Sequence, residues 1–384
     1  MHILIVPDSF KGSLSSTQVG ERIRDGLRSV LPQASFRLLP VADGGEGTVE
    51  AVSAAAGGTA YSVQVAGPMG NPVSAQYAVL PDGTAVLEMA QASGLPLVPL
   101  PLRDPGRATT RGTGELISAA LDQGCSRILI GIGGSATNDG GAGMARALGA
   151  RFLDRNGQEL AEGGGALEGL DRIDLSGLDP RLARAEFLVA SDVTAPLCGP
   201  QGASLVFSPQ KGASPQQAAR LDRCLAHYGQ VLEATFHRPL VNLPGAGAAG
   251  GLGAGLMAFC NAQLQPGIDI IFDLLHLEQE AAQADLIVTG EGRIDATSAT
   301  GKLLSGVGRL ARQYQKPAIA FAGAVALADA DLQAIGLQAA IPICDGPMAL
   351  EDSLSQASAL TFQAAQRTAR LIRLGSSLAT LFSP

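Results

Sequence analysis

A glycine-rich stretch at residues 127–145, RILIGIGGSATNDGGAGMA, carries the residue types best suited to binding an anion. The apolar run 128–132 is typical of a strand buried on both faces of a parallel sheet. The glycines after it let the backbone turn sharply, and N-cap residue types precede a predicted helix at 142–147. Because loop N–H groups and a helix N-terminus both attract anions, the stretch predicts a phosphate-binding loop. Its predicted ligand contacts are Gly133, Gly134, Ser135, Thr137 and Asn138.

The same stretch also fits a second kind of site. Residues 131–136, GIGGSA, match the relaxed dinucleotide fingerprint G-x-G-x-x-G/A, and Asp154 follows at about the distance of a ribose-binding acid. Residues 245–250, GAGAAG, match the strict fingerprint, but no convincing strand precedes them. The insert 137–139 brings an acid to a place where a dinucleotide-binding helix packs apolar residues. That acid suits a metal–phosphate site better.

Four further predicted strands end in polar residues flanked by glycine or proline. These residues are Asp8, Ser9 and Lys11 after strand 3–6; Asp43, Gly44, Gly45 and Glu46 after strand 36–41; Asp192 after strand 187–191; and Glu291, Arg293 and Asp295 after strand 285–289. Open α/β sheets bind ligands at the carboxyl ends of their strands. We therefore expect these clusters to line a shared substrate- and nucleotide-binding cleft between domains.

The charged members of these clusters suggest chemical roles. Asp139 and Asp192 are hard oxygen donors of the kind that hold Mg²⁺ beside substrate phosphates, although either could instead cap a helix. Lys11 offers a point charge to a phosphate, and Arg293 offers a planar fork, unless it forms a local ion pair. The predicted metal ligands are Asp139 and Asp192, and the predicted catalytic set is Asp192, Lys11, Arg293 and Asp43.

The order of predicted elements indicates two domains, which a length of 384 residues also favours. The first and last thirds alternate strands and helices, whereas residues 59–98 show the alternating pattern of antiparallel strands. We predict an α/β fold with a doubly wound, Rossmann- or flavodoxin-like parallel-sheet domain formed by 1–59 plus 284–384. A mixed α/β domain at 60–283, containing the phosphate loop, is inserted into it.

Composition excludes several classes of function. The net charge of −8, the absence of tryptophan and an aromatic content of 4% argue against a nucleic-acid partner. The five cysteines include no C-x-x-C pair, and no signal peptide or membrane span is evident, so we expect a cytoplasmic protein. Neither a Walker A motif nor the protein-kinase motifs occur. A small-molecule substrate is expected, and a homo-oligomer remains possible.

Several long motifs together resemble the bacterial glycerate kinase type 1 family. They are PDSFKGS at 7–13, VADGGEGT at 41–48, GIGGSATNDGGAG at 131–143, GAGAAGGLG at 245–253 and TGEGRID at 289–295. The motifs occur in the family's order and span nearly the whole chain. The resemblance implies two α/β domains and Mg²⁺- and ATP-dependent phosphorylation of D-glycerate. It favours 2-phosphoglycerate over 3-phosphoglycerate as the product.

One position departs from the family pattern, and two other functions remain to be compared. Thr297 stands where the family usually has glutamine, which shortens the reach of any hydrogen bond there. The alternatives to a kinase are a dinucleotide-dependent oxidoreductase acting on a small hydroxy acid and a non-catalytic nucleotide sensor on the same scaffold. Glycerate-dependent ADP release, a nicotinamide absorbance change, or nucleotide binding without turnover would distinguish the three.

Overall fold

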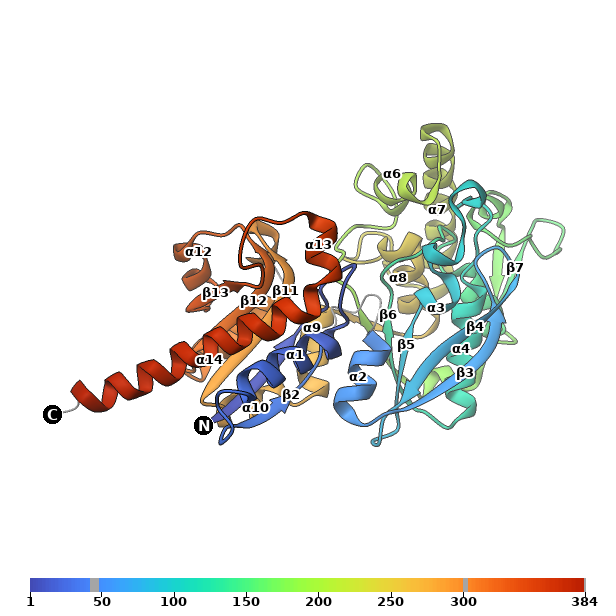
Figure 1. Ribbon diagram of the computed structural model, residues 1–384. Coiled ribbons are helices and arrows are strands. Elements are labelled where there is room, and N and C mark those ends of the chain that lie inside the picture. Colours follow the sequence, from blue (N-terminus) through green and yellow to red (C-terminus); the bar gives the residue numbers. More distant parts are fainter. Residues whose placement is uncertain (42–47, 300–302, 383–384) are drawn as a thin grey trace. The chain divides into compact units, whose positions relative to one another are not determined.

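The chain forms two α/β units, and the computed structural model describes residues 1–41, 48–299 and 303–382 (Figure 1). Unit 1 contains residues 1–43, 50–56 and 268–384, and unit 2 contains residues 44–49 and 57–267. Each unit is built on its own sheet. This confirms the predicted α/β fold with one parallel and one mixed sheet.

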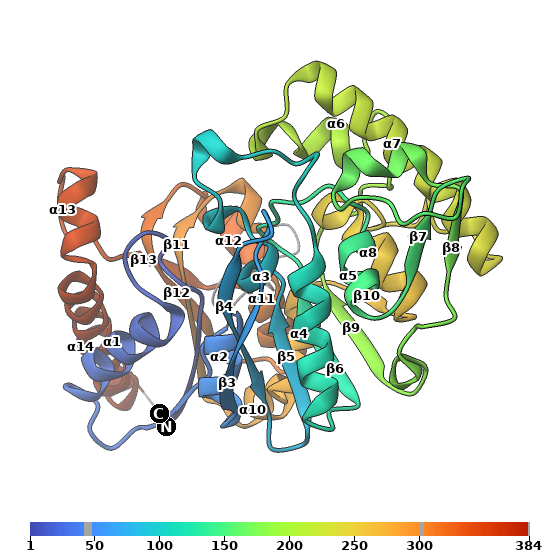
Figure 2. The same cartoon turned by 90° about the vertical axis from the view of Figure 1, so that its right-hand side faces the viewer.

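Unit 1 is built on a five-stranded parallel sheet. Its order is β13 (Ala339–Pro342), β12 (Ala318–Val325), β11 (Leu286–Ile294), β1 (His2–Pro7) and β2 (Ser35–Leu38). Every residue of β1 after His2 is buried, as a strand covered on both faces requires. Helices α1 (Ser16–Arg28) and α14 (Ala357–Phe382) pack side by side over one face (Figures 1 and 2).

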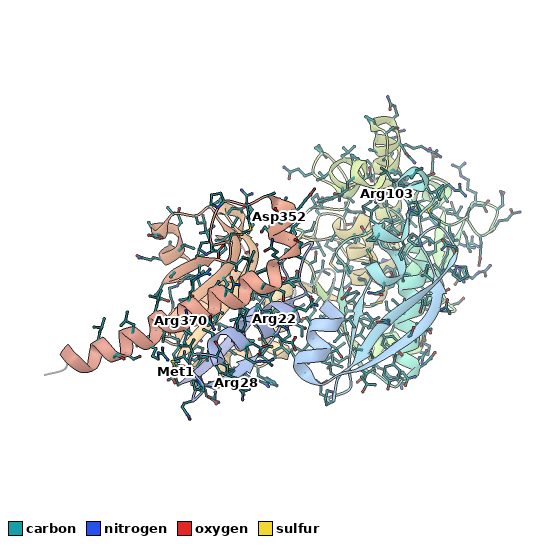
Figure 3. All side chains as sticks on the ribbon, in the orientation of Figure 1. Met1, Arg22, Arg28, Arg103, Asp352 and Arg370 are labelled. Carbon is teal, nitrogen blue, oxygen red and sulfur yellow. The ribbon has the colours of Figure 1, made fainter. Side chains whose placement is uncertain are left out.

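Local sequence explains why α1 forms and how it packs. Ser15 and Gln18 form a capping box, in which each side chain accepts a hydrogen bond from the other residue's backbone N–H. Val19, Ile23 and Leu27 recur at nearly helical spacing and are fully buried in the core shared with α14. The exposed residues of this helix pair include Arg28 of α1 and Arg370 of α14 (Figure 3).

The remaining elements of unit 1 are short helices, and the last part of the chain departs from prediction. The short helices are α9 (Gly267–Leu274), α10 (Leu277–Gln283), α11 (Leu303–Gln313), α12 (Asp329–Ala334) and α13 (Leu350–Ser355). The sequence predicts one closing helix over 353–374, whereas the structure has α13 and then α14, which continues to Phe382. The chain leaves helical geometry at Gln356, where φ is −99° and ψ is 4°.

Unit 2 contains a six-stranded mixed sheet. Its order is β10 (Gln263–Gln265), β9 (Glu186–Ala190), β6 (Arg127–Gly131), β5 (Thr84–Glu88), β4 (Pro72–Val79) and β3 (Thr59–Ala66). β3, β4 and β5 pair antiparallel, whereas β5, β6, β9 and β10 run parallel, and the β3–β4 pair is visible in Figure 2. The antiparallel strands predicted within 59–98 are thus confirmed, and they extend the parallel part of the sheet.

Helices and one small hairpin complete unit 2. The helices are α2 (Thr48–Ala56), α3 (Ala90–Ser93), α4 (Arg111–Asp122), α5 (Ala142–Ala147), α6 (Ala203–Phe207), α7 (Pro215–Phe236) and α8 (Ala248–Phe259). The boundary between the units falls within α2. The two short strands β7 (Arg151–Leu153) and β8 (Arg172–Asp174) pair antiparallel. α7 begins after Ser214, whose hydroxyl accepts the backbone N–H of Gln217, as its sequence predicts. No helix in the described part of the chain is both long and apolar enough to cross a bilayer.

The contact between α1 and α14 gives a stability prediction. A Cβ on Gly26 would lie 2.5 Å from the carbonyl oxygen of Phe362 and 2.7 Å from the Cβ of Ala365. Gly26→Ala should therefore push the helices apart and lower the free energy of unfolding by about 1–3 kcal/mol in a urea titration. Gly375→Ala is the matched control, because Gly375 is an exposed α14 residue with nothing within 4 Å of an added methyl group. The control should raise stability by about 0.5–1 kcal/mol, and equal effects in both variants would contradict the packing argument.

Candidate functional site

Three neighbouring strands of unit 2 end at the same edge of the sheet. The parallel register places Gly131 of β6 beside Ala190 of β9 on one side and Glu88 of β5 on the other. The loop at 132–141 therefore leaves the sheet next to Asp192, which follows β9. Asp192 is exposed, and its Oδ1 accepts the backbone N–H of Gly267 at 3.3 Å.

The glycine loop presents hydrogen-bond donors at its exposed part. Gly133 and Gly134 are exposed, and Gly134 has a φ of 73°, which favours glycine. Within the described residues, the backbone N–H groups of Gly133, Gly134 and Ser135 donate no hydrogen bond. Successive free N–H groups around a left-handed residue form a concavity that binds anions. The loop thus has the geometry of a phosphate site.

Asp139 lies beneath this loop and is fully buried. Its Oδ2 accepts the backbone N–H of Thr110 at 2.8 Å, the Thr110 hydroxyl at 2.9 Å and the N–H of Gly143 at 3.1 Å, and its Oδ1 accepts the N–H of Gly141 at 3.1 Å. Burial raises the pKa of Asp139, and these hydrogen bonds oppose that rise. The carboxylate therefore fills the first turn of α5, so the helix N-terminus is not open to a ligand. Metal ligation by Asp139 stays a prediction, and it would require breaking these bonds.

Lys211 is a buried residue of this site that the sequence analysis missed. Its side chain is 2% exposed, and Nζ donates to the Ser135 hydroxyl oxygen at 2.6 Å and to the Thr137 carbonyl oxygen at 2.7 Å. Burial lowers the pKa of Lys211 to about 7, while the Asp139 charge raises it. Its local sequence, SPQKG, is typical of a solvated turn, so no local signal reveals it.

Glu88, at the end of β5, is a second buried charged residue that sequence analysis missed. Its side chain is 2% exposed, and Oε1 accepts the backbone N–H of Val49 at 2.6 Å. The apolar pattern of the strand predicts β5 but does not indicate that the glutamate at its end is buried.

The second glycine-rich tract supports the first loop rather than forming a separate nucleotide site. A Cβ on Gly250 would lie 2.0 Å from the carbonyl oxygen of Thr137, and the N–H of Gly140 donates to the carbonyl oxygen of Gly250 at 3.0 Å. Ala249, Gly250 and Gly251 all have positive φ values of 52°, 69° and 90°. These glycines therefore allow two backbones to touch.

The fold also contradicts the dinucleotide-binding alternative. Asp154 follows β7, which pairs antiparallel with β8 in a separate two-stranded sheet rather than parallel with β6. Its Oδ1 accepts the backbone N–H groups of Asn156 and Gln158 within its own turn. The βαβ unit that would place an acid on a ribose is therefore missing from residues 127–174, all of which are described.

In unit 1, the loop after β1 lies beside the last part of β11. The sequence predicted that this strand ends at 289, but β11 continues to Ile294, because Glu291, Arg293 and Ile294 still pair with β12. Pro7 pairs with Gly290, and the N–H of Asp8 donates to the carbonyl oxygen of Gly290 at 2.8 Å. The backbone N of Lys11 lies 3.4 Å from the position of a Cβ on Gly292. The structure therefore brings together Asp8, Ser9, Lys11, Glu291, Arg293 and Asp295 at one edge of this sheet.

Individual side chains in this unit 1 cluster differ in exposure. Lys11 is exposed, and the backbone N–H of Ser9 donates to Asp8 Oδ1 at 2.6 Å. The Arg293 side chain is 68% exposed, and its guanidinium forms an ion pair with Asp295 at 3.1 Å. This is the local ion pair that the sequence analysis named as the alternative to a ligand contact. Four predicted site residues lie outside the described part of the chain: Asp43, Gly44, Gly45 and Glu46.

The described carboxylates fit a Mg²⁺ ion that takes most of its ligands from substrate phosphates and from water. Within the described residues, no group of three or more His, Cys, Asp or Glu side chains forms a metal cluster. Mg²⁺ needs only one or two carboxylates when phosphate oxygens and waters complete its shell. The exposed carboxylate of Asp192, next to the glycine loop, meets that requirement.

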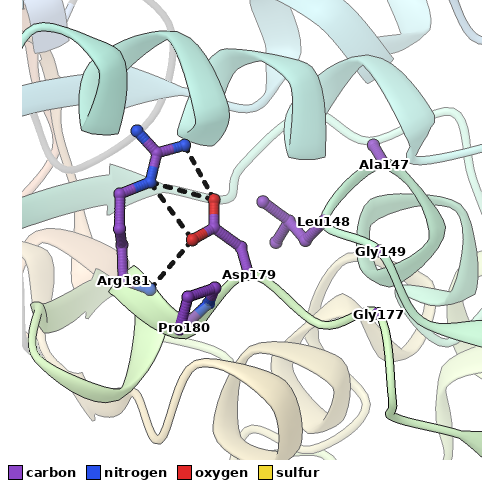
Figure 4. A pocket seen from close by; sticks show the side chains of 7 residues that line it. All are labelled: Ala147, Leu148, Gly149, Gly177, Asp179, Pro180 and Arg181. Atoms are coloured by element: carbon purple, nitrogen blue, oxygen red, sulfur yellow. Dashed lines mark hydrogen bonds and ion pairs between the residues drawn. The ribbon is translucent and has the colours of Figure 1, made fainter.

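A hollow on unit 2 lies apart from these loops and offers no free charge. Its volume is about 500 Å³, and its lining includes Leu148, Pro180, Asp179 and Arg181 (Figure 4). The Arg181 guanidinium contacts Asp179 through Nη2 at 2.7 Å and Asp122 through Nη1 at 2.7 Å. Because the charges satisfy each other, this hollow has no feature of a catalytic site.

These features define the class as a two-unit α/β protein with an exposed glycine loop and an exposed strand-end carboxylate at one sheet edge of unit 2. The model of the glycerate kinase family matches residues 3–373, so the chain belongs to the glycerate kinase family and is an enzyme of that kind.

Similar proteins cover nearly the whole chain. This chain is 52% identical to "Glycerate 2-kinase" of Escherichia coli K12 over 85% of this chain and 86% of that protein. It is 47% identical to "Glycerate kinase" of Bacillus subtilis 168 over 98% of this chain and 99% of that protein. A crystal structure from Salmonella typhimurium LT2, provisionally named glycerate kinase 2, matches with a TM-score of 0.90 and 48% identity over 98% of this chain and 99% of that one.

The contact between the two glycine segments gives a second prediction. Gly250→Ala should destabilise the protein and lower its turnover, because the new methyl would overlap the Thr137 carbonyl and displace the loop. Gly83→Ala is the control, since Gly83 has a similar φ of 83° but nothing within 4 Å of an added Cβ. The control should cost roughly 1–2 kcal/mol in urea unfolding and leave turnover unchanged. If Gly250→Ala behaves like the control in both measurements, the backbone contact does not shape the loop.

Proposed function

We propose that the enzyme transfers the γ-phosphoryl group of ATP to D-glycerate, forms 2-phosphoglycerate and requires Mg²⁺. The observation that carries this proposal is the run of N–H groups at residues 133–135 that have no partner among the described residues, in a chain of the glycerate kinase family. Phosphoryl transfer depends mainly on positioning and on charge stabilisation, and a rigid loop of backbone donors supplies both.

In this proposal the loop binds phosphate oxygens and Asp192 acts beside it. The N–H groups of Gly133, Gly134 and Ser135 donate to the nucleotide phosphates. Thr137 and Asn138, which the sequence predicted as ligand contacts, are fully buried, and they stabilise the loop through hydrogen bonds with Lys211 and Ser204 instead. Asp192 either holds Mg²⁺ or accepts the proton of the glycerate hydroxyl. When bound, Mg²⁺ neutralises charge that develops on the phosphate oxygens.

The unit 1 residues supply positive charge in the same proposal. Arg293 and Lys11 hold the glycerate carboxylate or the transferring phosphoryl group. The exposed pair between Arg293 and Asp295 contributes at most about 1 kcal/mol, so a substrate carboxylate can replace Asp295 at little cost. Asp8, Ser9, Glu291 and Asp295 are proposed to orient these cations and the substrate, together with Asp43, Gly44, Gly45 and Glu46.

The purified enzyme should release ADP from MgATP only when D-glycerate is present. The assay compares D-glycerate, L-glycerate, glycerol and no acceptor. Coupling the product directly to enolase should give a signal without added phosphoglycerate mutase, because enolase acts on 2-phosphoglycerate. A signal that appears only after mutase addition would show that the product is 3-phosphoglycerate. Absence of D-glycerate-dependent ADP release would overturn the proposed reaction.

Replacing Asp192 separates its two possible roles. Asp192→Asn keeps the size and removes the charge, so the loss of a general base should lower kcat by ~10²–10⁴. The loss of a metal ligand should also raise the Mg²⁺ concentration needed, and excess Mg²⁺ should partly restore the rate. Asp171→Asn, at an exposed acid of the same unit, is the control. If folded Asp192→Asn keeps kcat within about threefold of the control, a difference of only ~0.6 kcal/mol, Asp192 has neither role.

A further inference from the structure

The buried ammonium of Lys211 contacts the glycine loop from below. Lys211 ends a 3-10 turn at Pro209–Lys211, and its Nζ reaches Ser135 and Thr137, which are 76 and 74 residues away in the sequence. These are its two hydrogen bonds within the described residues, and both acceptors are neutral oxygens. The side chain therefore makes no direct ion pair there.

The buried ammonium group of Lys211 would be costly if it only connected the turn at 209–211 to the glycine loop. Burying an ammonium group without a carboxylate partner is unfavourable by several kcal/mol in typical proteins. The charge of Asp139 raises the pKa of Lys211, but the Asp139 carboxylate already accepts hydrogen bonds from four N–H or O–H donors. A neutral side chain would connect the turn to the loop without this cost. Because burial lowers the pKa of Lys211 to about 7, an anion bound beside the loop would favour the charged form of this side chain.

The contact with Ser135 also fixes what the serine hydroxyl can do. An ammonium group only donates hydrogen bonds, so the Ser135 oxygen must act as the acceptor at 2.6 Å. The hydroxyl proton of Ser135 is then left to be donated elsewhere, and no described residue accepts it. Ser135 is 8% exposed and directly follows the exposed Gly133 and Gly134, whose N–H groups are also unpaired. Among the described residues, this part of the loop thus has three backbone N–H groups and one hydroxyl whose protons are not donated to the protein.

We infer that Lys211 is a positioning residue for the nucleotide phosphates, which acts through Ser135. It holds the Ser135 oxygen as an acceptor, so the Ser135 hydroxyl donates to a phosphate oxygen bound by the loop amides at 133–135. Its positive charge, separated from the phosphate by the serine side chain, offsets the negative charge of the bound polyphosphate. This inference rests on the proposed function, because it places ATP phosphates at this loop.

Removing the charge should weaken nucleotide binding and leave glycerate binding unchanged. Lys211→Met keeps the apolar stem, and it should raise the KM for ATP and the Kd for MgADP about tenfold to hundredfold, as expected for a lost hydrogen-bonding charge. The KM for D-glycerate and the kcat at saturating ATP should stay near the wild-type values. The midpoint of thermal unfolding should stay equal or rise, because the burial cost of the ammonium is removed. Lys316→Met is the control, since Lys316 is a partly exposed lysine of unit 1.

Two further variants test whether Lys211 acts through Ser135. Lys211→Gln can keep N–H donors to Ser135 and Thr137 without the charge, and it should weaken MgADP binding less than Lys211→Met does. Ser135→Ala should weaken binding as Lys211→Met does, and the double variant should be no weaker than Lys211→Met alone. If Lys211→Met does not fold, Lys211→Gln and Ser135→Ala carry the same test.

Calorimetric titration with MgADP and with inorganic pyrophosphate keeps this inference separate from the proposed reaction. If the wild type fails to phosphorylate D-glycerate but the Lys211 variants lose affinity for these anions, the proposed reaction is wrong and the role of Lys211 stands. If the wild type turns over and the Lys211 variants bind MgADP and pyrophosphate as tightly as it does, the inference is overturned. A lower unfolding midpoint with unchanged nucleotide KM would also overturn it, because that result indicates a structural tie alone.

Discussion

The direct contact between two glycine-rich backbones is the constraint on which the rest of the unit 2 site depends. The carbonyl oxygen of Thr137 and the backbone of Gly140 lie against Gly250 and Gly251. A Cβ added to Gly141 would lie 3.1 Å from the Cα of Gly255. Side chains at these positions would separate the segments. The loop therefore takes its shape from backbone packing. Its N–H groups at 133–135, which have no partner in the described part of the chain, are held in place without a ligand.

A layer of buried polar groups beneath the loop completes this support. Asp139 binds the Thr110 and Gly143 backbones, Asn138 donates to the Ser204 hydroxyl at 2.9 Å, and Lys211 binds the loop at Ser135. Buried polar groups are costly unless they are hydrogen-bonded, so these contacts specify one loop conformation. A rigid set of donors also avoids reorganisation when charge develops during a reaction.

Both units use the same property of parallel sheets to gather polar groups. In unit 2 the ends of β5, β6 and β9 align, and in unit 1 the end of β1 lies beside Gly290 of β11, four residues before that strand ends. The strands themselves are apolar and buried, so their carboxyl ends are the first places where polar side chains reach solvent. This explains why predicted site residues that are far apart in sequence lie together within each unit.

The sequence by itself determined the features that depend on neighbouring residues. Apolar runs predicted the strands, and N-cap residue types predicted helix starts at Ser15 or Ser16 and at Ser214, of which the structure uses Ser15 and Ser214. The glycines at 131–143 predicted a tight loop after β6. These signals act within a few residues. Only the tertiary structure showed that Asp139 is enclosed by donors, that residues 245–250 pack against another loop, and that Lys211 is buried. Burial and pairing depend on segments tens of residues away, and a lysine in a polar turn has the same local pattern whether it is solvated or enclosed.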